Sequence, residues 1–559
     1  QLIPGHSKVV SSAGLAYLDD FESTKTTIDI HYPINWYLAS TPSKFEESKR
    51  SDQTIYGKNR ALMSWYYVDP ILNGDTKSTP DYLRNTPGLQ SNNLTRNVLE
   101  QEIFPNKETL ATQTSRMTIM NLSYYPTERG PYNLDVEPTS LSAGMKSDGT
   151  LLNPASRWGG IMRKLDATDF ETSNIEYIEF WMMDPFVKGG MTNEKSGDLY
   201  FNLGDVSEDI LKDGKKYFEN GLPAIDGDNT KTVTTVWGNV PKTQSTVSAF
   251  DNTAGARKNQ DVGLDGLSNA NEYIYPTYKN YFDSVNAKIT PAERVIMQND
   301  PFSPLNDPSG DNYHFYRGSD YDNSQKTILE RYKYFNGTEG NSPEATNVTE
   351  TYGTTATSLP DMEDINSDNT LNEYEKYYQY RVKIKRDKMS VGDNFITDKI
   401  TSTVTLKDGT QDDVTWYQFK IPIHTDSVEK IGSIRNFKSI RFIRMFLTGF
   451  EQETHLRFAT LDLVRGEWRN FNKVLYANTT QPISTGKLDV QAVNIEENAD
   501  KIPVNYILPP GITRETDPGQ PQLLQQNEQS MVLRVTDLAP GDARGVYKNT
   551  TYDMRQYKR

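Results

Sequence analysis

The sequence has 559 residues, of which 60 are basic and 75 are acidic, and it contains no cysteine. This length allows two to four domains with substantial cores. The absence of cysteine excludes a disulfide framework, iron–sulfur clusters and thiol catalysis. The net charge of −15 argues against nucleic-acid binding, which needs a basic surface. The 33 Tyr, 21 Phe and 7 Trp favour strands, because aromatic side chains pack well on pleated surfaces.

No apolar run reaches the roughly 18 residues that a transmembrane helix needs. The chain starts at Gln1 with neither a basic segment nor an apolar segment of a signal peptide. We interpret both ends as cuts in a longer protein.

Residues 1–140 predict an N-terminal β region with long loops. The run 26–31 has the composition of a strand, and 117–125 alternates enough to form another. Pro126 should end that second strand, since proline cannot donate to a sheet ladder.

The next block, residues 155–250, contains the clearest strand of the first half, at 175–183. The run 199–204 reads as its neighbour. Ser207 is suited to cap a short helix, with Glu208 and the following aspartate in its first turn.

Residues 251–380 are rich in Asp, Asn, Gly and Tyr and show little apolar periodicity. We expect a long irregular insertion there, with a short helix within 325–335.

Strands return at 380–475. In the run 415–423 apolar residues alternate with more polar ones, which predicts a half-buried strand of an antiparallel sheet. Further strands are expected at 440–446 and 456–464. The last segment, 476–559, reads as a Pro-rich linker with one strand, at 531–535, leading to the next module.

These patterns predict a mainly β protein. The expected fold is an antiparallel, jelly-roll-like β-sandwich over residues 141–475, with halves 155–250 and 380–475 around the insertion 251–380.

One loop matches the calcium-binding loop pattern. Oxygen donors stand at positions 1, 3, 5, 9 and 12 of this pattern, position 7 offers a backbone carbonyl, and position 12 would be the bidentate ligand. The residues at positions 1, 3, 5, 7, 9 and 12 are, in this order, Asp364, Asn366, Asp368, Thr370, Asn372 and Glu375. Position 6 is Asn369, which tolerates the left-handed turn. The alternative is a polar turn without metal.

A second, less complete copy consists of Asp261, Asp265, Leu267, Asn269 and Glu272. Gly266 stands where the sharp turn needs a glycine, but Gly263 leaves position 3 without a ligand. Both loops predict calcium as the bound ion.

The sequence does not predict an enzyme. None of the five histidines pairs with another at a helical metal spacing, and no nucleophile elbow, Walker loop or dinucleotide motif is present. Carboxylate pairs are abundant, as expected in an acidic chain, so a glycosidase stays open as an alternative.

The segment Arg157-Trp158-Gly159-Gly160-Ile161-Met162-Arg163 places two arginines around an indole and two glycines. Arginine can stack on tryptophan, and glycine allows backbones to approach closely. The segment reads either as a packed strand entry or as a docking or structural hub.

This segment and its neighbours resemble the SprA/Sov family, and the resemblance covers nearly the whole chain in register. It rests on long and unusual strings, which include Tyr124–Asn133, Arg157–Arg163, Ile175–Phe186, Leu199–Leu211, Gln260–Leu267, Tyr316–Asp320, Ile328–Tyr332, Trp416–Pro422 and Phe437–Leu447.

The resemblance implies an internal segment of the very large outer-membrane translocon of the type 9 secretion system, which also supports gliding motility. Such a translocon is a giant β-barrel at the cell surface of Gram-negative Bacteroidota. Its implied partners are a PorV-like shuttle protein, a plug protein and folded cargo with a C-terminal signal domain. It implies no catalytic residues.

A carbohydrate-binding β-sandwich of a cell-surface protein is the main alternative, because paired sheets with aromatic faces and calcium also suit glycans.

Overall fold

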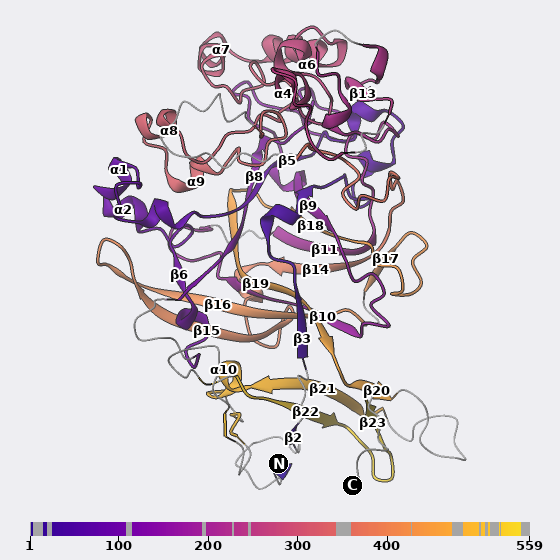
Figure 1. Ribbon diagram of the computed structural model, residues 1–559. Coiled ribbons are helices and arrows are strands. Elements are labelled where there is room, and N and C mark those ends of the chain that lie inside the picture. Colours follow the sequence, from indigo (N-terminus) through magenta and orange to yellow (C-terminus); the bar gives the residue numbers. More distant parts are fainter. Residues whose placement is uncertain are drawn as a thin grey trace.

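The computed structural model (Figure 1) describes residues 2–3, 15–19, 25–107, 115–192, 197–225, 229–243, 247–342, 359–425, 428–471, 485–501, 505–508, 513–514, 525 and 527–548. Within the predicted linker segment 476–559, the stretch 503–521 lies largely outside these residues. Within the described part of the chain, no helix has the length and apolar character needed to cross a membrane.

Seven antiparallel strands form the larger sheet. Their order is β15-β16-β10-β19-β8-β5, and β3 also pairs with β19. The bounds are β3 Lys25–Asp29, β5 Ala61–Tyr67, β8 Met120–Arg129, β10 Ile175–Met183, β15 Ile396–Thr405, β16 Gln411–Pro422 and β19 Thr454–Gly466.

Six antiparallel strands form the second sheet, in the order β17-β14-β11-β18-β9-β4. The bounds are β4 Tyr37–Leu38, β9 Trp158–Lys164, β11 Gly197–Asp205, β14 Lys376–Ile384, β17 Glu429–Ile431 and β18 Phe442–Thr448.

The two sheets pack face to face and share one large apolar core. Phe180 of β10 lies 5.6 Å, centroid to centroid, from Phe201 of β11. A Cβ atom at Gly159 of β9 would lie 3.0 Å from the ring of Tyr124 in β8, so a larger residue there would push the sheets apart. The prediction of a mainly β protein with antiparallel sheets is therefore confirmed.

Smaller sheets flank this sandwich. A four-stranded sheet, β1-β2-β22-β21, lies at the end of the sandwich away from most of the helices (Figure 1). Three two-stranded sheets pair β12 with β13, β20 with β23 and β6 with β7. The bounds are β1 Leu2–Ile3, β2 Leu15–Asp19, β6 Val98–Leu99, β7 Arg116–Met117, β12 Thr232–Thr234, β13 Asn239–Pro241, β20 Arg469–Phe471, β21 Lys487–Asn494, β22 Gln529–Thr536 and β23 Gly545–Tyr547.

The helices are short, and those of residues 256–298 gather at the opposite end (Figure 1). The α-helices are α1 Asp81–Arg84, α2 Pro87–Gln90, α3 Glu100–Ile103, α4 Ala256–Gln260, α5 Asn269–Glu272, α6 Pro276–Lys288, α7 Pro291–Gln298, α8 Ser319–Asn323, α9 Ile328–Arg331 and α10 Ile495–Asn498. The 3-10 helices are Pro33–Asn35, Glu46–Lys49, Gln53–Ile55, Pro70–Asn73, Pro154–Ser156, Glu219–Gly221, Asn229–Lys231 and Arg386–Lys388.

Helix α6 forms within the predicted irregular insertion. Pro276 occupies its first turn, and Tyr278, Tyr281 and Val285 are buried at helical spacing. Two of these three residues are tyrosines, whose polar hydroxyl groups make the apolar face of the helix hard to recognise in the sequence. We call residues 256–298 the helical cap.

The predicted strand at 175–183 is confirmed with its bounds, and those at 26–31, 199–204, 415–423, 440–446, 456–464 and 531–535 are confirmed in type, with shifted ends. The strand at 199–204 is not the neighbour of 175–183, because β11 lies in the other sheet. Pro126 does not end its strand, because β8 continues to Arg129. The pairing with β5 is irregular between Tyr125 and Arg129, so no regular ladder bond is required of Pro126.

Two further expectations are wrong. The backbone after Ser207 is not helical, and Glu208 instead accepts hydrogen bonds from the amides of Asn366 and Asn372. Strand β16 is buried on both faces near Trp416, because a second apolar cluster covers the outer face of the sheet with Val98 and Ile103.

The sandwich also begins earlier than residue 141. Strands β3, β5 and β8 of the predicted N-terminal unit lie in the seven-stranded sheet, and β4 lies in the six-stranded sheet.

Candidate functional site

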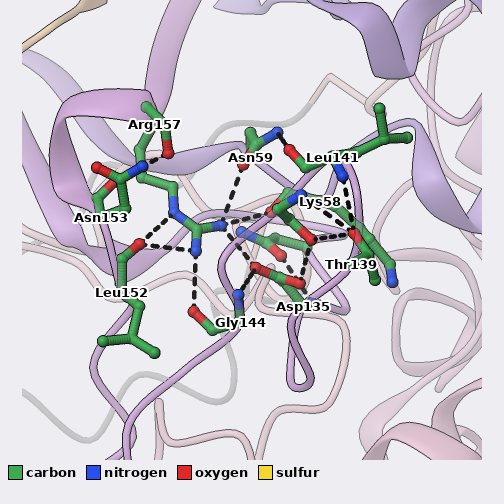
Figure 2. A network of polar contacts seen from close by, with 12 residues as sticks. Lys58, Asn59, Asp135, Thr139, Leu141, Gly144, Leu152, Asn153 and Arg157 are labelled. Carbon is green, nitrogen blue, oxygen red and sulfur yellow. Dashed lines mark hydrogen bonds and ion pairs between the residues drawn. The ribbon is translucent and has the colours of Figure 1, made fainter.

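Arg157 immediately precedes β9 and is fully buried. Its Nη1 lies 2.8 Å from Oδ2 of Asp135, and its guanidinium also donates to the carbonyls of Lys58, Gly144 and Leu152 (Figure 2). Because every donor has an acceptor, this buried cation is fully compensated by the chain.

Asp135 is also fully compensated, since it accepts bonds from the Ser142 hydroxyl at 2.6 Å and the Gly144 amide at 2.9 Å. The pair ties three loops to the start of β9. The predicted hub at Arg157 is therefore a buried structural node in this structure, and it offers no exposed docking surface.

The stacking partners at this node differ from the predicted ones. Arg60, not Arg157 or Arg163, lies over the Trp158 ring, 5.3 Å from its centre. Arg163 lies over Trp36 at 5.9 Å. Gly160 faces Phe446, where an added Cβ would lie 2.8 Å from the Phe446 Cβ.

The loop 364–375 is closed by its own hydrogen bonds. Asp364 accepts from the amides of Asp368 and Asn369, and Asp368 accepts from the Thr370 amide and hydroxyl. Asn369 has φ +70°, so it adopts the predicted left-handed turn.

Two arginines and a lysine supply positive charge at this loop, and the Lys216 Nζ atom lies 3.7 Å from Asp364. Both oxygens of Glu375 bind the buried Arg444 guanidinium, at 2.9 and 2.8 Å. Arg441 donates to Asn372 at 2.8 Å and lies 3.5 Å from Asp368. Glu375 is thus not placed as a bidentate metal ligand, and calcium at this loop stays a prediction.

The second loop is arranged differently. Asp261, its first predicted ligand, accepts three bonds from the backbone amides of Gly340, Asn341 and Ser342. Asp261 therefore anchors a neighbouring segment. Leu267 donates its amide to Asp265 at 2.9 Å.

Four carboxylates gather beside this loop, and we call them the acidic cluster: Asp265, Glu272, Asp311 and Glu339. One oxygen each from Glu272, Asp311 and Glu339 lie within 4.8 Å of one another. Among the residues that the structure describes, the buried atoms Asp265 Oδ2, Glu272 Oε1, Glu339 Oε2 and Asn269 Oδ1 have no hydrogen-bond partner of normal geometry.

Burial raises the pKa of every carboxyl in the acidic cluster, and the charges of the other carboxylates raise it further. The pKa of Asp311 rises to about 7 and that of Glu339 to about 10. The pKa values of Asp265 and Glu272 also rise well above their usual range. These shifts mark a site that disfavours the charged form of its carboxyl groups.

Asp311 and Glu339 were not predicted from the sequence. Asp311 belongs to the tight loop Asp307-Pro308-Ser309-Gly310-Asp311-Asn312, in which Asp307 accepts from the Gly310 amide at 2.7 Å. The Asp and Gly residues of this loop indicate a turn in the sequence. Nothing in the spacing links it to residue 272, 35 or more positions earlier.

The fold and these buried charges define an antiparallel β-sandwich protein with internal polar sites. A family model named SprA_N and described as "Motility related/secretion protein" matches residues 280–559, half of the chain. The chain belongs to this family, which confirms the resemblance seen in the sequence, and it is a motility- and secretion-related protein. No curated protein sequence matches it.

Proposed function

We propose that this chain is a segment of the outer-membrane translocon of the type 9 secretion system, which exports folded cargo and supports gliding motility. The observation that carries the proposal is the family match over residues 280–559. In this proposal the segment works by binding and assembly, without enzymatic turnover, at the cell surface of a Gram-negative Bacteroidota bacterium.

The proposed architecture of the segment is a jelly roll that belongs to a protein with a giant β-barrel. The strand order supports the jelly roll. Eight successive strands of the sandwich alternate between the two sheets along the chain, except that β11 and β14 lie in the same sheet. These strands are β8, β9, β10, β11, β14, β16, β18 and β19. The resulting orders, β8-β19-β10-β16 and β9-β18-β11-β14, are those of two interleaved Greek keys.

A rigid module suits this role. The buried Asp135–Arg157 pair and the partly buried Glu375–Arg444 pair fix loops to the ends of strands. A segment that must keep its shape while cargo passes gains from this rigidity. The proposed partners are a PorV-like shuttle protein, a plug protein and cargo with a C-terminal signal domain.

The experiment places an affinity tag in the exposed turn at Asp408-Gly409 of the full-length protein in its native host. The proposal expects the tagged protein in detergent-solubilised outer membranes, together with a PorV-like protein and a plug protein. Depletion of the protein should leave folded cargo in the periplasm.

Recovery of bound glycan without these protein partners would contradict the translocon and favour a carbohydrate-binding module. Hydrolysis of a glycan panel by the purified chain would instead favour a glycosidase.

A further inference from the structure

The acidic cluster combines deep burial with unpaired oxygen atoms, since Asp265, Glu272 and Asp311 are buried and Glu339 is half-buried. Glu272 is 0% exposed and Asp265 is 1% exposed. The Glu272 Oε2 atom accepts from the Ser309 amide at 2.9 Å, whereas Oε1 has no hydrogen-bond partner in the described part of the chain. A buried carboxylate with an unpaired oxygen is strongly destabilising unless a proton or a cation compensates it.

The carboxylates of the cluster lie close to one another and to a further acid. One oxygen each of Glu272, Asp311 and Glu339 lies within 4.8 Å of the other two. The Ser309 hydroxyl contacts Asp311 at 2.7 Å and the neighbouring Asp307 at 3.1 Å. A cation bound among these groups would therefore relieve repulsion at several carboxylates at once.

We propose that Glu272, Asp311 and Glu339 bind one calcium ion, with Asp265 and the Asn269 side-chain carbonyl beside them. All of these donors are oxygen atoms, which hard cations prefer. Two oxygens on one Ca²⁺ lie at most about 5 Å apart, since Ca–O distances are about 2.3–2.6 Å. The spacing within 4.8 Å fits this limit without rearrangement.

The structure also explains the incomplete loop pattern. Gly263 stands at the position that lacks a ligand, and a Cβ atom there would lie 1.9 Å from Asp311 Oδ2. The missing side chain thus leaves the space that Asp311 fills from a different segment. Asp311 is held there by the hydroxyls of Tyr132, at 2.7 Å from Oδ2, and Ser309, at 2.7 Å from Oδ1.

The ion would join three segments that meet at this site. Glu272 ends α5, and the backbone of Glu339 bridges to Val262 and to Asn312. Tyr132, which holds Asp311, follows β8 of the seven-stranded sheet. Calcium would therefore fasten the helical cap to the sandwich, a role that does not depend on the proposed secretion function.

Terbium luminescence tests this site directly, because Tb³⁺ replaces Ca²⁺ and is sensitised by nearby aromatic rings. Tyr132 contacts Asp311, and Trp237 lies 6.1 Å from the Tyr132 ring. Titration of the chelator-treated chain with Tb³⁺ should give saturable emission upon aromatic excitation, and Ca²⁺ should displace it.

Variants locate the site. Glu272→Gln and Asp311→Asn should each weaken Tb³⁺ binding at least about tenfold. Asp364→Asn in the other loop and Asp283→Asn on the exposed face of α6 should leave it unchanged. Because a cluster variant can misfold, thermal melts of the wild-type chain in calcium and in chelator give a second readout, with the higher melting temperature expected in calcium.

Three results would overturn the proposal. They are the absence of sensitised emission in the wild-type chain, emission that persists in both cluster variants, and a melting temperature that chelator does not change. The last result would mean that protons alone neutralise the cluster.

Discussion

The two loops with calcium-type spacing differ in how the chain treats their charge. In the loop 364–375, Arg444 binds both oxygens of Glu375 and Arg441 lies beside Asp368. In the loop 261–272, Glu272 has an unpaired buried oxygen, and its strongest charged neighbours are acids. The loop that matches the pattern better is therefore the one with less need of a metal.

This difference shows that ligand spacing alone does not predict a metal site. The spacing predicts which oxygen atoms can lie close together. Whether a metal ion binds there also depends on the charged side chains that other segments place beside the loop. Both arginines of the first loop come from β18 and the residue before it, about 70 positions away. No local pattern in the loop contains that information.

The largest expected effect tests the compensation in the first loop. Arg444→Met removes the guanidinium that pairs with Glu375, whose side chain is 19% exposed, and should destabilise the chain by about 3 kcal/mol, the lower end of the range for breaking a buried pair. Thermal unfolding measures this loss, with Lys279→Met as a control in an exposed pair. The double variant Arg444→Met, Glu375→Met should recover much of it. A loss no larger than that of the control would show that the first loop does not depend on Arg444.

Metal removal should have the next largest effect. At free calcium about 100 times the dissociation constant, a bound ion adds about 2.7 kcal/mol to stability. Chelator should therefore lower the melting temperature of the wild-type chain, and to the same extent that of Asp364→Asn. If Asp364→Asn alone lost its response to chelator, the roles of the two loops would be reversed.

Gly263→Asp improves the match of the second loop to the calcium pattern, yet it should weaken the site. Residue 263 has φ +76°, and an added Cβ would meet Asp311. Left-handed strain at a non-glycine residue costs about 1–3 kcal/mol, and Asp311 would have to move. Lower stability and weaker Tb³⁺ binding are expected from melts and titrations. Tighter binding would mean that the loop pattern matters more than Asp311.

Asn369→Gly should have the smallest effect. It completes the pattern of the first loop at a position whose φ is already +70°. The change in stability should stay within about 1 kcal/mol, because glycine adopts this conformation easily but gains entropy when unfolded. In a chain that also carries Asp311→Asn, the Asn369→Gly substitution should not make the melting temperature depend on calcium. A new response there would contradict the account of the first loop.

Alternation and aromatic content were sufficient to predict the strands with strong patterns, such as 175–183 and 456–464. They left β9 open between a packed strand entry and a hub, because its two glycines lack β propensity, although these glycines allow close packing against Tyr124 and Phe446. They also did not predict α6, whose buried face uses tyrosine. At the site, Glu272 and Asp265 were predicted from spacing, whereas Asp311 and Glu339 join them only through the tertiary fold.

The most direct test of this account is the position of a bound ion in crystals of the chain grown with Tb³⁺. The account predicts an anomalous density peak between the carboxylates of Glu272, Asp311 and Glu339. A peak within the loop 364–375 with none at the acidic cluster would contradict it.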